Sequence, residues 1–217
     1  MSGQPTSGRV DDRSAAATCP VRCRCGAVRG ELRDLQSANR VVCYCYDCQA
    51  FAHVLGDAGS TLDARGGSDI VQVLPKNLSF SAGRDRLACL RLTAKGLLRW
   101  YTDCCNTPIG NTLATPKLSF IGLLHVCLDS TAVPLDAAFG PVQVCAYSHG
   151  AKGPEPKPRE VGKGRMLSWF IRKPLKARFN GDYKITPLFR PDTGAPIATP
   201  RVLSSAELAN VMAAVRQ

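Results

Sequence analysis

The sequence lacks long hydrophobic runs. No stretch approaches the roughly 20 consecutive apolar residues that a membrane-spanning helix needs, so we expect no membrane span. The first eighteen residues are polar and rich in Ser, Gly and Ala, and they contain no apolar core of the kind found in signal peptides. We therefore expect no secretion signal, a cytoplasmic location, and a disordered tail over residues 1–18.

Acidic residues are scarce relative to basic ones. The 217 residues include 17 Asp and Glu against 28 Lys and Arg, which gives a formal net charge of +11 and an isoelectric point near 9.3. Such a balance suits nucleic acid, an acidic membrane surface or a small anion, and it also simply keeps a protein soluble. Part of the excess lies in the C-terminal third, so it says little about the rest of the chain.

Cysteine, in contrast, is abundant. The chain has 11 cysteines, an odd number, and most of them lie in tight clusters. Together with the missing secretion signal, this indicates a reducing compartment and metal-bound thiolates rather than a disulfide framework. The hydrophobic content of 45% predicts one sizeable core, or one domain with an appended segment.

The most informative cysteines are Cys43, Cys45 and Cys48, which have C-x-C-x-x-C spacing. Residues two apart on an extended chain share a face, and a tight turn brings the third thiol round to meet them. Three soft thiolates suit Zn²⁺ and leave a tetrahedral ion one position short, which is the mark of a catalytic rather than a structural zinc. Alternatively, a fourth ligand closes the site. His53 is one candidate for that ligand or for an acid/base, although a surface or core histidine is the simpler interpretation.

A second group of thiols is divided between two distant segments. Cys23 and Cys25 form a C-x-C pair followed by Gly26, which lets the backbone fold tightly beside a metal. Cys104 and Cys105 come about 80 residues later, in a turn that follows an expected strand. If the fold brings the later turn back to Cys23 and Cys25, the thiols would together hold a zinc ion that links the two distant segments. The alternative is that the later pair are unrelated surface cysteines.

Short apolar runs separated by turn signals predict an antiparallel all-β domain. The expected strands are 28–32, 41–44, 70–74, 78–81, 87–92, 97–101, 120–128 and 142–147, with a short helix over 49–55. Three further cysteines, Cys89, Cys127 and Cys145, fall inside these strands, where we expect them to act as small buried hydrophobes.

The remainder of the chain predicts a linker and a mostly helical extension. Residues 151–162 are Pro-rich, and 163–217 begin with a basic amphipathic segment kinked or restarted at Pro174. That segment would contact a membrane, bind nucleic acid or fold back on the β domain. We favour folding back, because Trp169 and Phe170 need burial. A final helix ending at Arg216 would be capped by Ser204 or Ser205, with Glu207 completing a capping box.

The cysteine pattern resembles a known family. C-x-C-G at Cys23, C-x-C-x-x-C at Cys43, and a Cys turn followed by Thr107 and Pro108 are similar to the glutathione-dependent formaldehyde-activating enzyme and centromere protein V family. The resemblance covers residues 19–150 and implies a β-tent of antiparallel sheets, like the Mss4-type zinc proteins, stapled by zinc. It implies two zinc ions. The structural zinc would be held by Cys23, Cys25 and the Cys104/Cys105 turn, and the active-site zinc by Cys43, Cys45 and Cys48.

The third motif departs from the family pattern, which is C-x-x-C-G-T-P. Thr102 stands at the first cysteine position and Asn106 replaces the glycine, while Cys105 fits the second cysteine. The fourth ligand of the structural zinc is therefore open between Cys104 and Cys19. Adjacent cysteines on one metal would strain the chain.

The resemblance implies a zinc-dependent carbon–sulfur lyase that acts on a thiol adduct of an aldehyde, with a small thiol such as glutathione as partner. Zinc lowers the pKa of a bound thiol, so the thiolate acts as nucleophile or leaving group. The two carboxylates of glutathione would need arginines, and the candidates are Arg24, Arg40, Arg84 and Arg91.

Two other functions compete with the lyase. The protein could be a non-catalytic zinc-stapled binding module whose basic C-terminal segment docks nucleic acid or a protein partner. It could also be a sensor of metal or oxidant, although no helix-turn-helix signature accompanies the cysteines.

Overall fold

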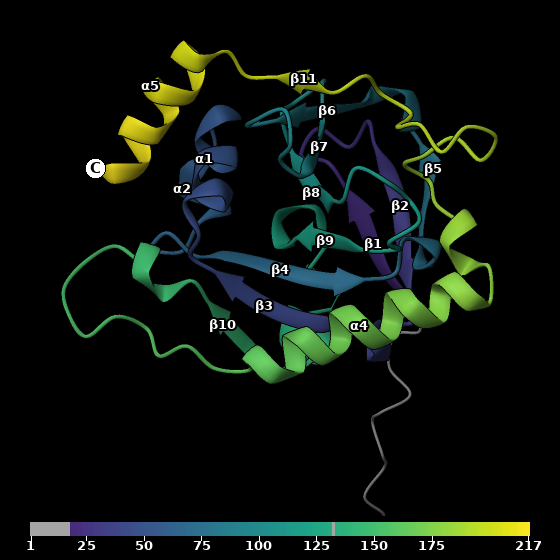
Figure 1. Ribbon diagram of the computed structural model, residues 1–217, viewed down its shortest axis with the longest axis horizontal. Coiled ribbons are helices and arrows are strands. Elements are labelled where there is room, and N and C mark those ends of the chain that lie inside the picture. The colour runs from purple at the N-terminus through teal and green to yellow at the C-terminus, as the bar shows by residue number, and fades with distance from the viewer. Residues whose placement is uncertain (1–17, 132) are drawn as a thin grey trace, which may run out of the picture.

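Strands dominate the computed structural model, which describes residues 18–131 and 133–217 (Figure 1). The described strands are β1 (Thr18–Arg22), β2 (Arg29–Arg33), β3 (Asn39–Cys43), β4 (Ser68–Val73), β5 (Leu78–Ala82), β6 (Leu87–Arg91), β7 (Leu98–Thr102), β8 (Pro108–Thr112), β9 (Ile121–Leu124), β10 (Val144–Ala146) and β11 (Arg201–Val202). The α-helices are α1 (Tyr46–Val54), α2 (Ala58–Thr61), α3 (Leu135–Phe139), α4 (Lys163–Phe179) and α5 (Ser205–Arg216). The tail expected over 1–18 lies outside the described residues, except for Thr18, which begins β1.

The strands form two sheets. The smaller has the order β1-β2-β5 and is antiparallel, and the larger has the order β10-β3-β4-β9-β8-β7-β6-β11. Both edge strands of the larger sheet are parallel to their neighbours, β10 to β3 and β11 to β6. The expectation of purely antiparallel sheets is therefore wrong at these edges. Each edge strand is reached by a long connection, which permits parallel pairing, whereas a tight hairpin does not.

The main core joins the two sheets. Leu32 of β2 and Leu78 of β5 belong to the same buried cluster as Trp100 of β7, Ile109 of β8 and Leu123 of β9. Trp100 is fully buried, and its indole N–H donates to the Thr112 hydroxyl at 2.9 Å. Sequence alternation gives each short strand one apolar face, and the core forms where those faces meet.

Most expected strands are confirmed, with differences at their ends. The run 120–128 stops as a strand at Leu124 and continues as a 3₁₀ turn over His125–Cys127. Strands β1, β8 and β11 were not expected, and β8 is a Pro-Ile-Gly-Asn-Thr sequence that has one large apolar side chain although all five residues are buried. Cys89 and Cys127 are buried as expected, whereas Cys145 is only half-buried.

The C-terminal segment folds back on the β-sheets, as expected. Helix α4 continues through Pro174, so of the two expectations, a kink or a restart at this residue, the restart is wrong. Its Trp169 is buried, and the indole N–H donates to the Ser37 carbonyl at 3.2 Å, while Phe170 stacks on Phe120 with ring centroids 4.7 Å apart. Within the described residues, no helix is both long enough and apolar enough to cross a membrane.

Helix α5 completes a second core cluster. Ser204 and Glu207 form the expected capping box, which satisfies backbone N–H groups at the start of the helix. Val211 and Val215 of α5 pack in one cluster with Phe51 of α1. Figure 1 shows α5 lying beside α1. The C-terminal extension thus fixes α1, the helix that follows the central cysteine motif.

Candidate metal centres

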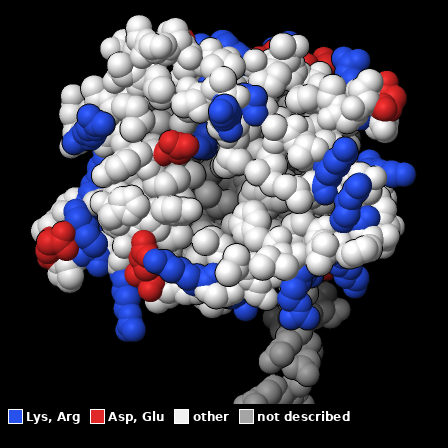
Figure 2. Space-filling model, in the orientation of Figure 1, with Lys and Arg blue, Asp and Glu red and all other residues white. Residues whose placement is uncertain are grey.

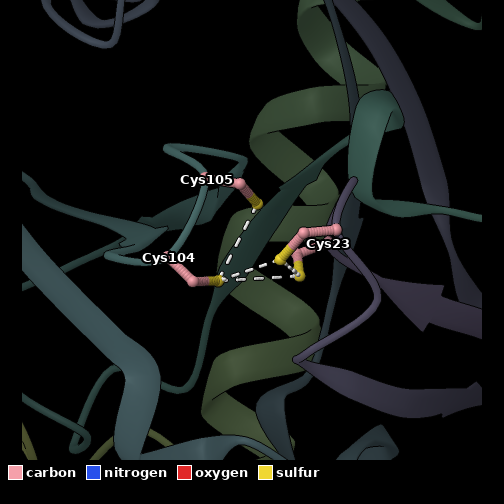
Figure 3. A group of neighbouring side chains, drawn as sticks. Cys23, Cys104 and Cys105 are labelled. Carbon is pink, nitrogen blue, oxygen red and sulfur yellow. Dashed lines mark hydrogen bonds between the residues drawn. The ribbon is translucent and has the colours of Figure 1, made fainter.

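The structure brings the two distant cysteine pairs together. Cys23 and Cys25 lie in the turn between β1 and β2, and Cys104 and Cys105 lie in the turn between β7 and β8. All four sulfur atoms are within 4.8 Å of one another, and Figure 3 shows those of Cys23, Cys104 and Cys105 turned toward a common point. The alternative of unrelated surface cysteines is therefore wrong.

The spacing of these four thiols fits a zinc ion. Zinc–sulfur bonds of about 2.3 Å in a tetrahedron place the sulfur atoms about 3.8 Å apart. The measured Sγ–Sγ distances are 3.4 Å for Cys23–Cys25, 3.3 Å for Cys25–Cys104, 3.9 Å for Cys23–Cys104 and 3.8 Å for Cys104–Cys105. A four-thiolate donor set of this size suits a structural zinc.

Local hydrogen bonds also suit thiolate ligands. The Val28 backbone N–H donates to the Cys23 sulfur at 3.3 Å. Burial raises the pKa of Cys105, but contacts with the hydroxyls of Thr102 and Thr107, at 3.4 and 3.1 Å, outweigh it and lower the pKa to about 5. Asn106 adopts φ 53°, a left-handed conformation that asparagine tolerates better than most residues. This turn lets two adjacent cysteines face one point.

Cys19 does not join this cluster. It is fully buried in the core between the sheets, and its sulfur contacts the Pro20 carbonyl at 3.7 Å. Burial and the nearby carboxylate of Asp129 raise the pKa of its thiol to about 11, and the pKa of Cys104 is also raised by burial, to about 12, so the choice between the two rests on position alone. Of the two fourth-ligand candidates, the geometry favours Cys104.

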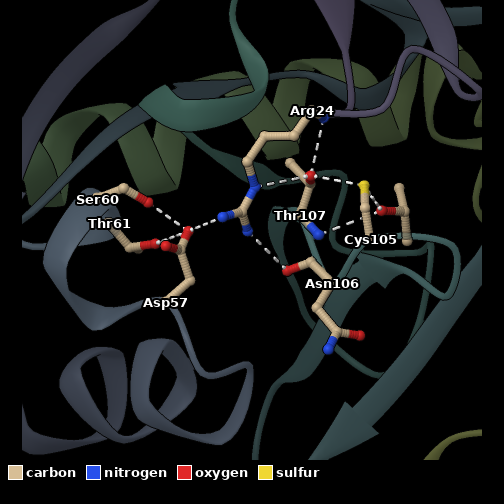
Figure 4. A network of polar contacts seen from close by, with 8 residues as sticks. Arg24, Asp57, Ser60, Thr61, Cys105, Asn106 and Thr107 are labelled. Carbon is tan, nitrogen blue, oxygen red and sulfur yellow. Dashed lines mark hydrogen bonds and ion pairs between the residues drawn. The ribbon is translucent and has the colours of Figure 1, made fainter.

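Arg24 ties this centre to the rest of the fold, as Figure 4 shows. Its backbone N–H donates to the Thr107 hydroxyl at 3.0 Å, and its guanidinium pairs with Asp57 at 2.6 Å and donates to the Asn106 carbonyl at 3.4 Å. Asp57 precedes α2, so one side chain links both cysteine turns to the α1–α2 region. Arg24 was a candidate for binding a substrate carboxylate, and the structure engages it here instead.

The central trio lies where a strand passes into a helix. Cys43 ends β3, Cys45 is the N-cap of α1, and Cys48 is in the first helical turn. The three sulfur atoms are within 4.8 Å of one another. The helix begins at Tyr46, earlier than expected, so a helical turn rather than a tight loop brings Cys48 round. A helix N-terminus also favours the negative charge of thiolates.

No fourth side chain completes the trio among residues 18–131 and 133–217: the group has three potential ligands. His53 is not among them. It lies five residues beyond Cys48 in α1, half-buried, and burial lowers its pKa. Three soft thiolates suit Zn²⁺, and the fourth tetrahedral position faces no protein ligand in the described part of the chain.

An arginine that the sequence analysis missed lies beside the trio. Arg99 of β7 is almost fully buried, donates to Asn111 Oδ1 at 3.1 Å, pairs with Asp47 at 3.5 Å and stacks over the Phe51 ring at 5.5 Å. Hydrogen bonds with the other two thiols and the charge of Arg99 lower the pKa of Cys48, although burial opposes the shift. The sequence did contain one sign of this residue's role: Arg99 is a charged residue inside the otherwise apolar Leu-Arg-Trp-Tyr strand.

The other expected arginines are engaged elsewhere. Arg40 is buried against Asp69 and Asp136, Arg84 donates to the Pro187 carbonyl at 2.8 Å, and Arg91 donates to the Gly96 carbonyl at 3.1 Å. None of these three is among the residues that line the space beside the trio. The prediction that they orient a substrate is not supported by their positions.

The trio lines a cavity of about 580 Å³. Figure 2 shows this face hollowed near its centre, over β9 and beside α4, with most charged side chains away from the hollow. Arg99 and Asn111 contribute polar groups, and Phe170 of α4 contributes an apolar one. A volume within about 300–1,000 Å³ is typical of small-molecule sites.

The segment after β10 forms part of the cavity mouth. Tyr147 and His149 line the cavity with Tyr46, and the His149 ring lies edge-on to Tyr46 at 5.9 Å. This segment approaches the cysteine loop so closely that a Cβ on Gly150 would lie 2.1 Å from the Tyr44 carbonyl. No local pattern in the sequence predicts these residues, because only long-range packing brings them to the trio.

The sequence matches, over residues 15–199, a family described as a family of unknown function, DUF6151. The match spans most of the chain. The chain belongs to this family. Both cysteine groups, the cavity and α4 lie inside the range of the DUF6151 match, and α5 follows it. The comparison with curated proteins found no match.

Proposed function

We propose that this protein is a zinc-dependent carbon–sulfur lyase of the β-tent type, which acts on an adduct between a small thiol and an aldehyde. One observation carries the proposal: Cys43, Cys45 and Cys48 form a three-thiol group that faces a cavity and has no fourth ligand among the described residues. A structural zinc would close its coordination with protein ligands, as the four thiols of Cys23, Cys25, Cys104 and Cys105 could do.

The chemistry needs no redox partner. Joining a thiol to an aldehyde forms one carbon–sulfur bond, and the proton lost by sulfur is gained by the carbonyl oxygen. The reverse reaction breaks that bond and leaves the electron pair on sulfur. A zinc ion, when bound, would lower the pKa of the incoming thiol so that it ionises near neutral pH.

The side chains around the trio support this role. Three thiolates against the +2 charge of zinc leave a net charge of −1, and the cation of Arg99 beside Cys48 offsets it. Asp47 and Asn111 hold Arg99 in place at 3.5 and 3.1 Å, so the charge is fixed before a substrate enters. Apolar walls limit the water that competes for the open position.

Isothermal titration of the zinc-loaded protein with a small thiol tests the proposal. We expect one thiol to bind per protein, with binding lost in Cys48→Ser and retained in the matched control Cys145→Ser, whose thiol lies outside both groups. In parallel, NMR exchange measurements should show faster interconversion of thiol, aldehyde and adduct with the wild-type protein than with Cys48→Ser. Equal binding by wild type and Cys48→Ser would contradict the proposal.

A second candidate is a binding module that uses α4. This helix has six basic residues and no acidic ones, and its solvent side exposes Leu167 by 61%, Ile171 by 53% and Phe179 by 83%. The charges suit nucleic acid, whereas the apolar side chains suit a protein partner. Fluorescence anisotropy with duplex DNA separates the functions. Salt-dependent binding that is lost in the double variant Arg172→Glu, Lys176→Glu would favour the module, and we expect no such binding.

A further inference from the structure

The walls of the cavity beside the trio are largely apolar. They come from elements far apart in the sequence: β4, the segments flanking β7, β8 and β9, and α4. The larger apolar side chains of these walls include Ile70, Leu97, Leu113, Phe120, Met166 and Phe170. Apolar surface of this kind stabilises an apolar ligand in proportion to the area that both remove from water.

The charged groups that line the cavity are already paired with each other. Among the described lining residues these are Arg99 and Asp47, whose guanidinium and carboxylate are 3.5 Å apart. The Arg99 side chain is only 2% exposed, because Asn111 and the Phe51 ring also cover it. A ligand with two free carboxylates, such as glutathione, would therefore find no unpaired Lys or Arg in this lining, where the other basic side chain is the exposed imidazole of His149.

Helix α4 supplies a fixed part of the apolar wall. Phe170 stacks on Phe120 at 4.7 Å, and the neighbouring Trp169 lies edge-on to Phe120 at 6.1 Å. The Arg165 side chain anchors the helix by donating to Asn39 Oδ1 at 3.0 Å. The wall is thus part of the packed fold, and a ligand meets it without first ordering a loop.

We infer that the substrate is a thiol adduct with an extended apolar group of several carbon atoms, which lies against Phe170 and Leu113 while its sulfur is held at the trio. The inference rests on the proposed function, because it takes Cys43, Cys45 and Cys48 as the point where sulfur is held. It narrows the range of substrates from any small thiol to hydrophobic thiols, and it excludes glutathione as the preferred partner.

A series of 1-alkanethiols from ethanethiol to hexanethiol tests the inference by calorimetric titration of the zinc-loaded full chain. Each added methylene removed from water is worth about 0.8 kcal/mol, which corresponds to an affinity gain of about fourfold per methylene. We expect hexanethiol to bind at least tenfold more tightly than glutathione. An affinity that does not depend on chain length, or tighter binding of glutathione, would overturn the inference.

Variants of the wall locate the binding site. Phe170→Ala should weaken hexanethiol binding about tenfold and leave ethanethiol nearly unchanged, whereas the control Ile171→Ala, on the exposed side of α4, should change neither. Leu113→Ala, from the segment after β8, is a second variant in case Phe170→Ala loosens the helix, and it should show the same dependence on chain length. Equal effects of Phe170→Ala and Ile171→Ala, or no effect of Leu113→Ala, would count against the site.

The same titrations distinguish the inference from the proposed function. If hexanethiol binds equally well to Cys48→Ser, the cavity accepts the apolar group but the trio does not hold the sulfur, so the proposed function fails and the apolar site stands. If ethanethiol, hexanethiol and glutathione bind with equal affinity, and all require the intact trio, the proposed function stands and the apolar specificity fails.

Discussion

Replacing Cys104 by serine is expected to remove one zinc ion and abolish the cooperative fold. Cys104 contacts Cys23 and Cys25 across the gap between the β1–β2 and β7–β8 turns, so the ion it helps to hold joins both sheets. A structural zinc contributes about 10–16 kcal/mol in small peptides, as much as the total stability of about 5–15 kcal/mol of a typical domain. Elemental analysis and a thermal melt followed by circular dichroism measure both effects.

The control for this variant is Cys145→Ser. Cys145 is half-buried on the edge strand β10 and belongs to neither thiol group, so two zinc ions and a melting temperature within about 5 °C of wild type are expected. If Cys104→Ser keeps two zinc ions and melts like the control, then this cluster does not staple the sheets, and the first centre is misassigned.

Cys48→Ser is expected to have the opposite pattern: one zinc ion is lost and the fold remains. The trio lies within six residues, so a metal there closes only a short loop and adds little to the joining of distant segments. β3 is also held by β4 and β10, and α1 is held by α5, without any metal. We expect about two zinc ions in wild type, about one in the variant, and a melting temperature within about 5 °C of wild type.

Unfolding of Cys48→Ser would mean that the trio is structural, and the proposed enzyme would lose its main support. Retention of two zinc ions would mean that Cys48 is not needed to hold the second ion. Comparing Cys48→Ser with Cys104→Ser therefore assigns a separate role to each thiol group, because the two proposals predict different combinations of metal loss and unfolding.

The cysteine trio could be predicted from local spacing, and the cavity beside it could not. Cys43, Cys45 and Cys48 are close in the chain, so strand and helix periodicity alone place them together. Arg99 reaches the trio only through the strand order β7-β8-β9-β4-β3, and no local sequence feature predicts that order. His149 depends on the parallel pairing of β10 with β3.

The difference between local and long-range signals also explains which parts of the fold could be predicted. Turn residues and alternation predicted the positions of most strands, because both signals are local. Parallel pairing at the edges of the larger sheet depends on where a long connection returns, and neither β10 nor β11 carries a sequence signal for it. The return of α4 was predictable because Trp169 and Phe170 needed burial, and Phe120 is the ring that both of them contact.

The most direct test of the account is a crystal structure of the zinc-loaded protein with and without a bound 1-alkanethiol. We expect an ion on the sulfur atoms of Cys43, Cys45 and Cys48, with solvent in the fourth position and the thiol sulfur replacing it. An ion whose fourth ligand is a side chain of the same molecule, such as Asp47 or His149, would contradict it. So would a fully metallated protein without an ion at the trio.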